Sequence, residues 1–173
     1  EKSGCDFSLL KEVERVNQGR IEGFVKKLRD ELWVVRGKKL AVWGLAFKPN
    51  TDDVRFAPSI ALIQALLKEG ATVRAYDPEA MDKAKADLPN IEYCQDPYEA
   101  AEGADAILIV TEWEQFRNLD WRRLKGIVEQ PLILDGRNMF DPNEVARNGF
   151  RYVSVGRVST SSVDASETEV ARA

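Results

Sequence analysis

Histidine is absent from the 173 residues of this chain. Its absence excludes an imidazole general base, a histidine-dependent catalytic triad and a histidine metal site. Cysteine is scarce, because only Cys5 and Cys94 occur, and their separation fits no metal-ligand spacing. We therefore expect no metal site and a reduced, cytoplasmic protein.

Long apolar runs are missing as well. No stretch approaches the roughly 18 apolar residues that span a bilayer, and no basic-then-apolar signal segment opens the chain, so the sequence predicts no membrane span. The net charge of -4 and the pI of about 5.1 supply no basic field. This charge argues against nucleic acid and anionic membranes as partners.

The composition suits one globular domain with its own core, since 44% of the residues are hydrophobic and 31% are charged. The chain opens at Glu1, in a segment that already reads as the middle of a helical region. We expect a fragment of a longer protein. Three parts are predicted, namely a long helix in residues 1–37, an α/β domain in residues 38–157 and a flexible tail in residues 158–173.

Apolar residues at spacings of three and four predict a helix over residues 7–35. We expect Asp6 or Ser8 to cap this helix and Gly37 to stop it. At about 1.5 Å per residue, such a helix is longer than a small domain is wide. Its apolar stripe is therefore predicted to pack outside the domain, with a helix that lies across its own sheet as the alternative. The stripe comprises Leu10, Val13, Ile21, Phe24, Val25, Leu28, Leu32 and Val35.

From residue 38 onward, short apolar runs alternate with helical segments. Strict alternation predicts an α/β fold, with an open Rossmann-like parallel sheet that has helices on both faces and is preceded by one long helix. Strands are expected at residues 40–44, 72–76, 91–94, 106–110, 131–134 and 152–155. Helices are expected at residues 59–69, 79–87, 97–102 and 143–148, and one helix or two short turns at residues 114–124.

The loops after the strands are the places to look for a site, because an open parallel sheet binds ligands at its carboxyl edge. The loop at residues 44–55 has one glycine, whereas a dinucleotide fingerprint needs three so that the backbone can approach a pyrophosphate. It is therefore unsuited to hold NAD in the usual way. Lys48 and Arg55 in this loop, with Arg137 after the fifth strand, favour a phosphorylated ligand bound by side-chain charge.

Two aromatic residues, Phe47 and Trp113, follow the same strands and offer flat apolar faces, although a tryptophan there is more often core. Each cation also has an ordinary alternative: Lys48 can be merely solvated, and each arginine can pair with a nearby carboxylate. Those carboxylates are Asp52 and Asp53 for Arg55, and Asp135 and Asp141 for Arg137. These residues alone predict an α/β domain with an anionic or nucleotide ligand.

A family resemblance rests on residues 44–55, which read Gly-Leu-Ala-Phe-Lys-Pro-Asn-Thr-Asp-Asp-Val-Arg. This motif closely resembles the C-terminal domain of the UDP-glucose/GDP-mannose dehydrogenase family. The match continues through Tyr76-Asp77-Pro78, Thr111-Glu112-Trp113 and Asp135-Gly136-Arg137-Asn138, and the segment from Cys5 to Asn17 looks like the family's central helix. The resemblance covers about residues 4–157.

The resemblance implies an enzyme that oxidises the sugar C6 alcohol to a carboxylate in two NAD-dependent steps, through a thiol-linked intermediate. It implies that an N-terminal domain binds NAD, that the central helix forms a homodimer through residues 7–35, and that the C-terminal domain holds the nucleotide of a UDP-sugar. By position, Phe47 and Lys48 look like the pair that contacts the nucleotide sugar. Arg137 looks like a second substrate contact, and Arg55 like the arginine that reaches the NAD side of the cleft.

Departures from the family pattern limit what this chain does alone. The glycine-rich segment with the catalytic cysteine and the NAD-binding fingerprint are both missing, and neither Cys5 nor Cys94 has the required context. We therefore expect no catalytic residue here and no activity in isolation. Phe56 follows Arg55 where the family usually has an acidic residue.

The strand-end motifs resemble the UDP-glucose branch, which implies oxidation of UDP-glucose to UDP-glucuronate. The alternatives are a GDP-mannose or UDP-N-acetylmannosamine dehydrogenase, or a non-catalytic UDP-binding or dimerisation module.

Overall fold

A computed structural model describes residues 8–157, with side chains described from residue 19 onward. The predicted tail at 158–173, the candidate cap Asp6 and the thiol of Cys5 lie outside the described residues. The strands are β1 (Lys39–Trp43), β2 (Thr72–Tyr76), β3 (Glu92–Tyr93), β4 (Ala106–Ile109), β5 (Leu132–Asp135) and β6 (Arg151–Ser154). The helices are α1 (Ser8–Leu32), α2 (Pro58–Lys68), α3 (Met81–Ala84), α4 (Pro97–Ala101), the 3₁₀ helix η1 (Glu114–Asn118), α5 (Trp121–Ile127) and α6 (Pro142–Arg147).

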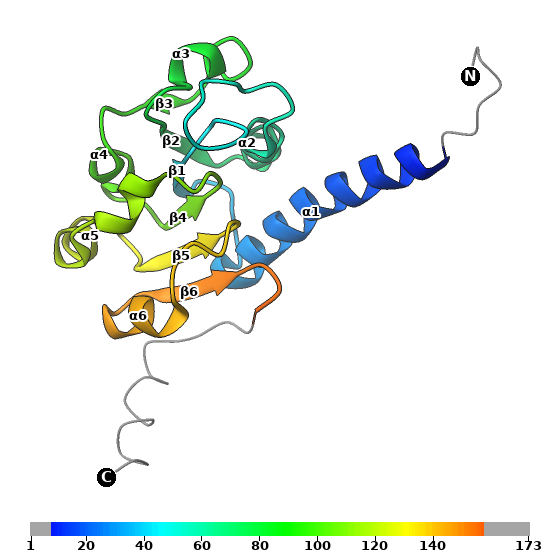
Figure 1. The fold of residues 1–173 in the computed structure, drawn as a ribbon. Helices are drawn as coiled ribbons and strands as arrows, with labels where there is room; N and C mark the ends of the chain where they lie inside the picture. The colour runs from blue at the N-terminus through cyan, green and yellow to red at the C-terminus, as the bar shows by residue number, and fades with distance from the viewer. Residues whose placement is uncertain (1–7, 158–173) are drawn as a thin grey trace.

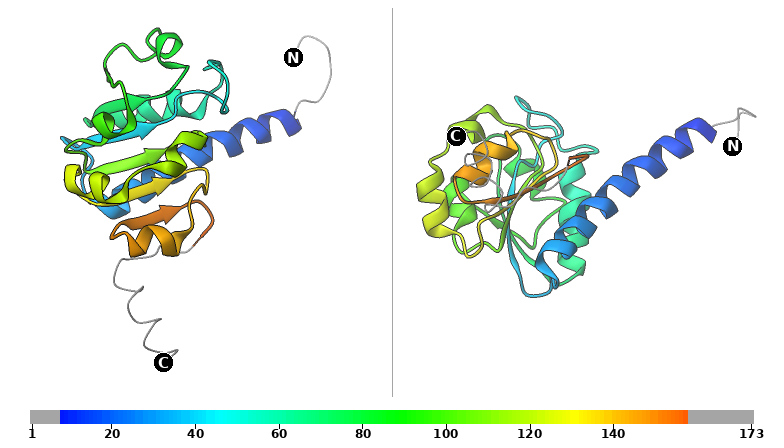
Figure 2. Two further views of the ribbon diagram at one scale, coloured as in Figure 1. Left: turned by 60° about the vertical axis from the view of Figure 1, so that its left-hand side comes forward. Right: turned by 90° about the horizontal axis from the view of Figure 1, so that it is seen from below.

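The strands form one parallel sheet in the order β3-β2-β1-β4-β5-β6. The order reverses between β1 and β4, which places the switch point of a doubly wound sheet between these neighbours. Helices α1 and α2 cover one face, and α4, α5 and α6 cover the other (Figures 1 and 2). The predicted α/β fold is confirmed.

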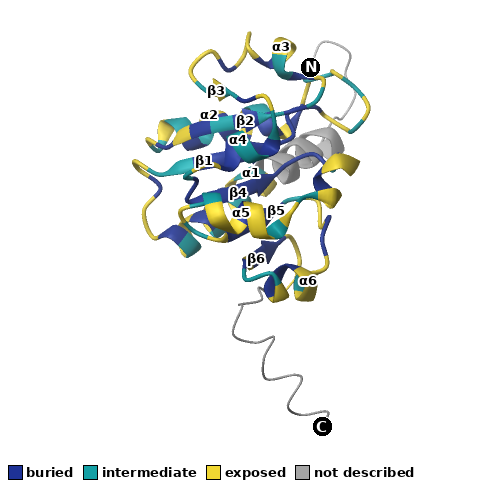
Figure 3. Ribbon diagram, turned by 90° about the vertical axis from the view of Figure 1, so that its left-hand side faces the viewer, coloured by how far each residue is buried: buried dark blue, intermediate teal, exposed yellow. Residues whose placement is uncertain are grey.

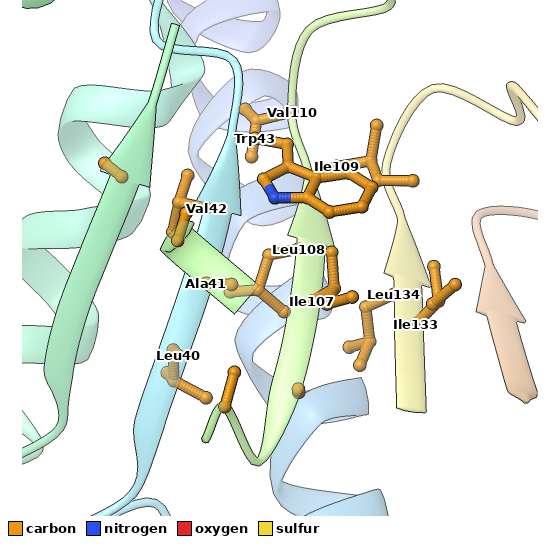
Figure 4. Close-up of a cluster of buried hydrophobic side chains, with 14 of the residues drawn as sticks. Leu40, Ala41, Val42, Trp43, Ile107, Leu108, Ile109, Val110, Ile133 and Leu134 are labelled. Carbon is orange, nitrogen blue, oxygen red and sulfur yellow. The ribbon is translucent and has the colours of Figure 1, made fainter. Parts of the chain in front are cut away.

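The central strands lie in the core of the molecule. Every residue of β4 and β5 is buried, as is all of β1 beyond Lys39, and Figure 3 shows the sheet as a buried layer between more exposed helices. Aliphatic side chains from these strands, together with Trp43, pack on one another (Figure 4). A strand that is covered on both faces has no solvent side, which explains the uninterrupted apolar runs in the sequence.

Aspartate caps start three of the short helices. Asp96 accepts a hydrogen bond from the N–H of Glu99 at 2.8 Å and caps α4. Asp120 caps α5 and Asp141 caps α6 in the same way. The Asp120 cap also explains why residues 114–124 are not one helix, because a cap residue has non-helical backbone angles and separates η1 from α5.

The carboxyl-terminal half of helix α1 packs on the sheet of its own domain. Val25, Leu28 and Leu32 are buried there, and Arg29 donates to Glu69 beside α2 through Nε at 3.0 Å. For the described side chains, the alternative of a helix that packs on its own sheet is therefore confirmed. Leu10 and Val13 belong to the part of α1 whose side chains lie outside the description.

The predicted helix stop at Gly37 is wrong. Helix α1 ends at Leu32, and Trp33 adopts the left-handed conformation with φ of 62° while its N–H bonds to the carbonyl of Arg29 at 2.8 Å. This is the arrangement that ends many helices, usually with glycine at that position. Gly37 instead forms the turn into β1, where its N–H bonds to the carbonyl of Gly70.

The amino-terminal half of α1 extends beyond the body of the domain, on the side where the strands end (Figures 1 and 2). The ring of Phe24 marks the point where the helix passes this edge. A Cβ placed on Gly136, which directly follows β5, would lie 3.3 Å from that ring. The residues of α1 before Phe24 therefore project past the carboxyl edge of the sheet.

Candidate functional site

The loops that leave β1, β2, β4 and β5 meet at the carboxyl edge around the switch point. The loop between β1 and α2 is the longest of them and spans residues 44–57. It carries Phe47, Lys48 and Arg55, whereas Arg137 lies in the loop after β5. The sheet therefore brings the predicted site residues to one edge.

Gly44 lets the β1 loop lie directly on Thr111, in the loop after β4. Its φ is 92°, and a Cβ there would meet the Cβ of Thr111 at 2.4 Å, closer than two carbons can approach. The Thr111 hydroxyl donates to the carbonyl of Ala46 at 2.6 Å. Gly44 therefore packs against another part of the domain, and its backbone is not open to a pyrophosphate.

Asp77 is fully buried after β2 and accepts hydrogen bonds from three different loops. The donors, at 2.6–3.0 Å, are the backbone N–H groups of Leu45, Ala46, Glu79 and Ala80 and the indole Nε1 of Trp113. Burying a carboxylate is costly unless it is well hydrogen-bonded, and these bonds meet that requirement. The sequence motif Tyr76-Asp77-Pro78 did not predict this role of Asp77 as the junction of the site.

Trp113 is 7% exposed, with its indole N–H directed at Asp77. The prediction that its ring offers a flat face to a ligand is wrong, and the core alternative is confirmed. Phe47 differs, because it is 47% exposed and its backbone N–H bonds to the carbonyl of Asp53 at 2.8 Å. The first loop is closed by that bond while the Phe47 ring remains accessible.

Lys48 is exposed beside Phe47. Within residues 19–157 no carboxylate or hydrogen-bond acceptor pairs with its ammonium group. Two other cations at this edge are neutralised. Lys83 pairs with Asp52 at 2.6 Å, and Arg55 pairs with Asp53.

Arg55 forms a two-point ion pair with Asp53, through Nε at 2.9 Å and Nη2 at 2.9 Å. Hydrogen bonds from Arg55 lower the pKa of Asp53 to about 2. The sequence left both Asp52 and Asp53 as partners, and the structure selects Asp53. Phe56, the residue after Arg55, is 94% exposed with φ of 59°, and Asp53 is the acidic residue that Arg55 contacts.

Arg137 is fixed at its backbone and paired at its side chain. Its N–H donates to the buried carboxylate of Asp135 at 2.8 Å, whereas its Nε bonds to Glu112. The expectation that its guanidinium pairs with Asp135 or Asp141 is wrong, because Asp135 is occupied by other donors and Asp141 caps α6. The other donors to Asp135 are the N–H groups of Met139 and Phe140 and the hydroxyl of Tyr152.

The pKa of the Tyr152 hydroxyl is raised, first by burial and then by its hydrogen bond to Asp135. Tyr152 is therefore a neutral donor that helps hold Asp135 in place. The neighbours Thr111 and Glu112 connect the two cationic loops, since Thr111 bonds to the Lys48 loop and Glu112 to Arg137. In the sequence, Glu112 stands out only as part of the Thr111-Glu112-Trp113 motif.

Cys94 is 1% exposed, and burial raises the pKa of its thiol to about 11. Cys94 is therefore an inert core residue, since the thiolate is the reactive form. Its sulfur lies within 4.8 Å of carboxylate oxygens of Glu92 and Glu99. Arg74 already pairs with Glu92 at 2.8 Å, so a cation occupies the place where a metal ion would balance charge. No helix among the described residues is long and apolar enough to cross a membrane.

Comparison with known proteins identifies the family of this domain. Residues 41–142 match the UDP binding domain of the UDP-glucose/GDP-mannose dehydrogenase family. The chain is 53% identical over 123 residues to a UDP-glucose 6-dehydrogenase of Rhizobium meliloti, covering 71% of this chain and 28% of that protein. It is 44% identical over 165 residues to a UDP-glucose 6-dehydrogenase of Pseudomonas aeruginosa, covering 91% of this chain and 36% of that protein.

A solved structure shows the same fold. The UDP-glucose dehydrogenase of Pyrobaculum islandicum superposes with a TM-score of 0.73 at 35% identity, over 86% of this chain and 32% of that one. The chain thus spans about a third of the length of the relatives it matches.

Proposed function

Because the chain belongs to the UDP-glucose/GDP-mannose dehydrogenase family, as its UDP-binding domain, we propose that it holds the UDP part of a nucleotide sugar at the carboxyl edge of its sheet. Lys48 and Arg137 bind the diphosphate, and Phe47 supplies an apolar face to the nucleotide sugar. The observation that carries the proposal is the convergence of two cationic loops on the adjacent residues Thr111 and Glu112.

The chemistry of this edge matches a diphosphate. A diphosphate needs cations, and the Lys48 ammonium has no competing partner within residues 19–157. An arginine adds a planar fork of donors that suits phosphate oxygens. The loops that carry both cations are fixed by the buried carboxylates Asp77 and Asp135, so little ordering is needed when the ligand binds.

We further propose that the chain works as part of an NAD-dependent UDP-glucose 6-dehydrogenase, which converts UDP-glucose to UDP-glucuronate in the cytoplasm. The names of the relatives from R. meliloti and P. aeruginosa support this substrate, and the free thiol of Cys94 agrees with a reducing compartment. The first loop does not fit NAD, because its glycine packs on Thr111. NAD is therefore proposed to bind mainly outside the described residues, with Arg55 at the NAD side of the cleft.

Calorimetric titration with UDP tests the binding site. We expect Lys48→Ala and Arg137→Ala each to weaken UDP binding about 10- to 100-fold, since a charge-assisted hydrogen bond contributes about 1.5–3 kcal/mol. Lys68→Ala is the matched control, because Lys68 is exposed at the opposite end of α2 and its loss should leave binding unchanged. Equal effects of all three substitutions, or no UDP binding by the folded chain, would contradict the proposal.

A ligand panel tests the sugar. UDP-glucose is expected to bind more tightly than GDP-mannose and at least as tightly as UDP-N-acetylmannosamine. The reverse order would assign the chain to another branch of the family.

A second proposal concerns assembly, namely a homodimer through the helix at residues 7–35. It is supported by the part of α1 before Phe24, which projects past the sheet (Figure 2), and by the apolar stripe of the sequence. Light scattering should give a dimer mass for the chain and a monomer mass after Leu10→Asp with Val13→Asp. A monomer at every concentration for the unaltered chain would rule the dimer out.

A further inference from the structure

We propose that Glu112 is a positioning residue for the diphosphate, which holds the Arg137 guanidinium by Nε and so presents its two Nη groups to the ligand. This inference rests on the proposed UDP site and adds a residue that does not itself touch the ligand. The observation behind it is the direct hydrogen bond between Arg137 Nε and Glu112 Oε2.

The ion pair occupies only one side of the guanidinium. Within residues 19–157, Nε of Arg137 bonds to Glu112, and neither Nη group has a partner. The side chains of Arg137 and Glu112 remain 31% and 38% exposed, so the pair lies at the surface of the edge. An arginine bound at Nε keeps a pair of parallel N–H donors, which is the geometry that binds two phosphate oxygens.

Both members of the pair stand on fixed backbone. Glu112 lies between Thr111, whose hydroxyl bonds to Ala46 at 2.6 Å, and Trp113, whose indole bonds to Asp77 at 3.0 Å. The N–H of Arg137 bonds to Asp135 at 2.8 Å. The backbone on each side is therefore held by buried hydrogen bonds, and the ion pair settles the remaining freedom of the long arginine side chain.

The sign of the effect separates positioning from simple electrostatics. A carboxylate near a diphosphate repels it, so removal of the Glu112 charge would tighten UDP binding if charge were the whole effect. Positioning predicts the opposite, because Arg137 without its partner samples many rotamers and must be ordered again when the ligand binds. Glutamine at position 112 keeps an oxygen that can accept the Nε hydrogen bond and removes only the charge.

The experiment is a titration of UDP, and of uridine as a probe without phosphate, against the wild-type chain, Glu112→Gln, Glu112→Ala, Arg137→Ala and the double variant Glu112→Ala with Arg137→Ala. We expect Glu112→Ala to weaken UDP binding about tenfold and Glu112→Gln about threefold or less. Uridine affinity should not change. In the Arg137→Ala background, Glu112→Ala should have no further effect, because coupled residues are not additive.

Glu114→Ala is the matched control, since this carboxylate lies two residues further along and is 82% exposed; it should bind UDP as the wild type does. Thermal unfolding should be the same for all variants.

Tighter UDP binding by both Glu112 variants would overturn the inference in favour of charge repulsion. If Glu112→Ala weakened UDP binding equally in the wild-type and Arg137→Ala backgrounds, the inference would be overturned in favour of a general structural role of Glu112. If the wild-type chain did not bind UDP at all, the proposed function itself would be wrong. That outcome is distinct from a failure of the Glu112 inference, in which the wild type still binds UDP.

Discussion

The indole Nε1 of Trp113 donates a hydrogen bond to Oδ2 of Asp77 at 3.0 Å, and both residues are buried. This bond joins the loop after β4 to the residue that directly follows β2, across the loop that leaves β1. The same oxygen holds the N–H groups of Leu45 and Ala46. The base of the Lys48 loop is therefore fixed from two neighbouring strands.

Asp77→Asn should destabilise the chain by about 3 kcal/mol. The asparagine keeps one oxygen acceptor, but its NH₂ group replaces the other oxygen and would face N–H donors that then have no acceptor. Urea unfolding followed by circular dichroism measures the loss. Asp52→Asn is the control, since the exposed pair with Lys83 contributes about 0.5 kcal/mol. A loss below about 1 kcal/mol for Asp77→Asn would contradict the assigned role.

Trp113→Phe should cost about 1–2 kcal/mol more than Trp43→Phe in urea unfolding. Both substitutions remove the same volume and one indole hydrogen bond from the core, but Trp113 donates to a carboxylate and Trp43 to the carbonyl of Pro97 at 3.1 Å. UDP affinity should fall for Trp113→Phe only, because that bond supports the Lys48 loop. Equal changes in affinity would show that the bond has no special effect on the site.

Gly44→Ala should destabilise the chain by about 3 kcal/mol or more, since the new Cβ would overlap Thr111. Gly37→Ala provides the control, because Gly37 also has a positive φ of 78° but no atom near its Cβ position. Its cost should be the backbone strain alone, about 1–2 kcal/mol. The midpoints of thermal unfolding compare the two, and a similar loss would mean that the contact with Thr111 relaxes.

Cys94 should make stability fall at high pH. Burial raises the pKa of its thiol from 9.0 to about 11, so the folded state favours the protonated form. The contribution is complete below pH 9.0, the value for the unfolded chain, and is lost as the pH rises through 11, by about 3 kcal/mol at most. The free energies of unfolding of the wild type and of Cys94→Ala are measured from pH 8 to 11. The wild type should lose stability relative to the variant as the pH rises. A difference between the two that stays constant would rule out the shift.

Local patterns were enough for most of the fold. The aliphatic runs of β4 and β5, the Asp96 cap and the alternation of short segments required no long-range information, and the parallel sheet follows from them. The end of α1 could not be predicted in this way. Trp33 takes a left-handed conformation that local preference assigns to glycine, because the chain must turn there to bring β1 into the sheet.

Residue types and positions were also enough to place the cations of the site at strand ends. The partners of these cations were not predictable, because distance in sequence does not measure distance in space. Arg137 pairs with Glu112, which is 25 residues away, rather than with the nearer Asp141. The sequence left Trp113 with both a stacking role and the commoner core role, and the fold decided for the core by placing Asp77 beside its indole.

The sequence by itself determined the class of fold, the family and the edge of the sheet where charge collects, because these depend on periodicity and on short motifs. Only the tertiary structure decided which groups are occupied and which remain available for a ligand. That distinction depends on hydrogen bonds between loops far apart in the chain, and these exist only after the parallel strands have brought the loops together.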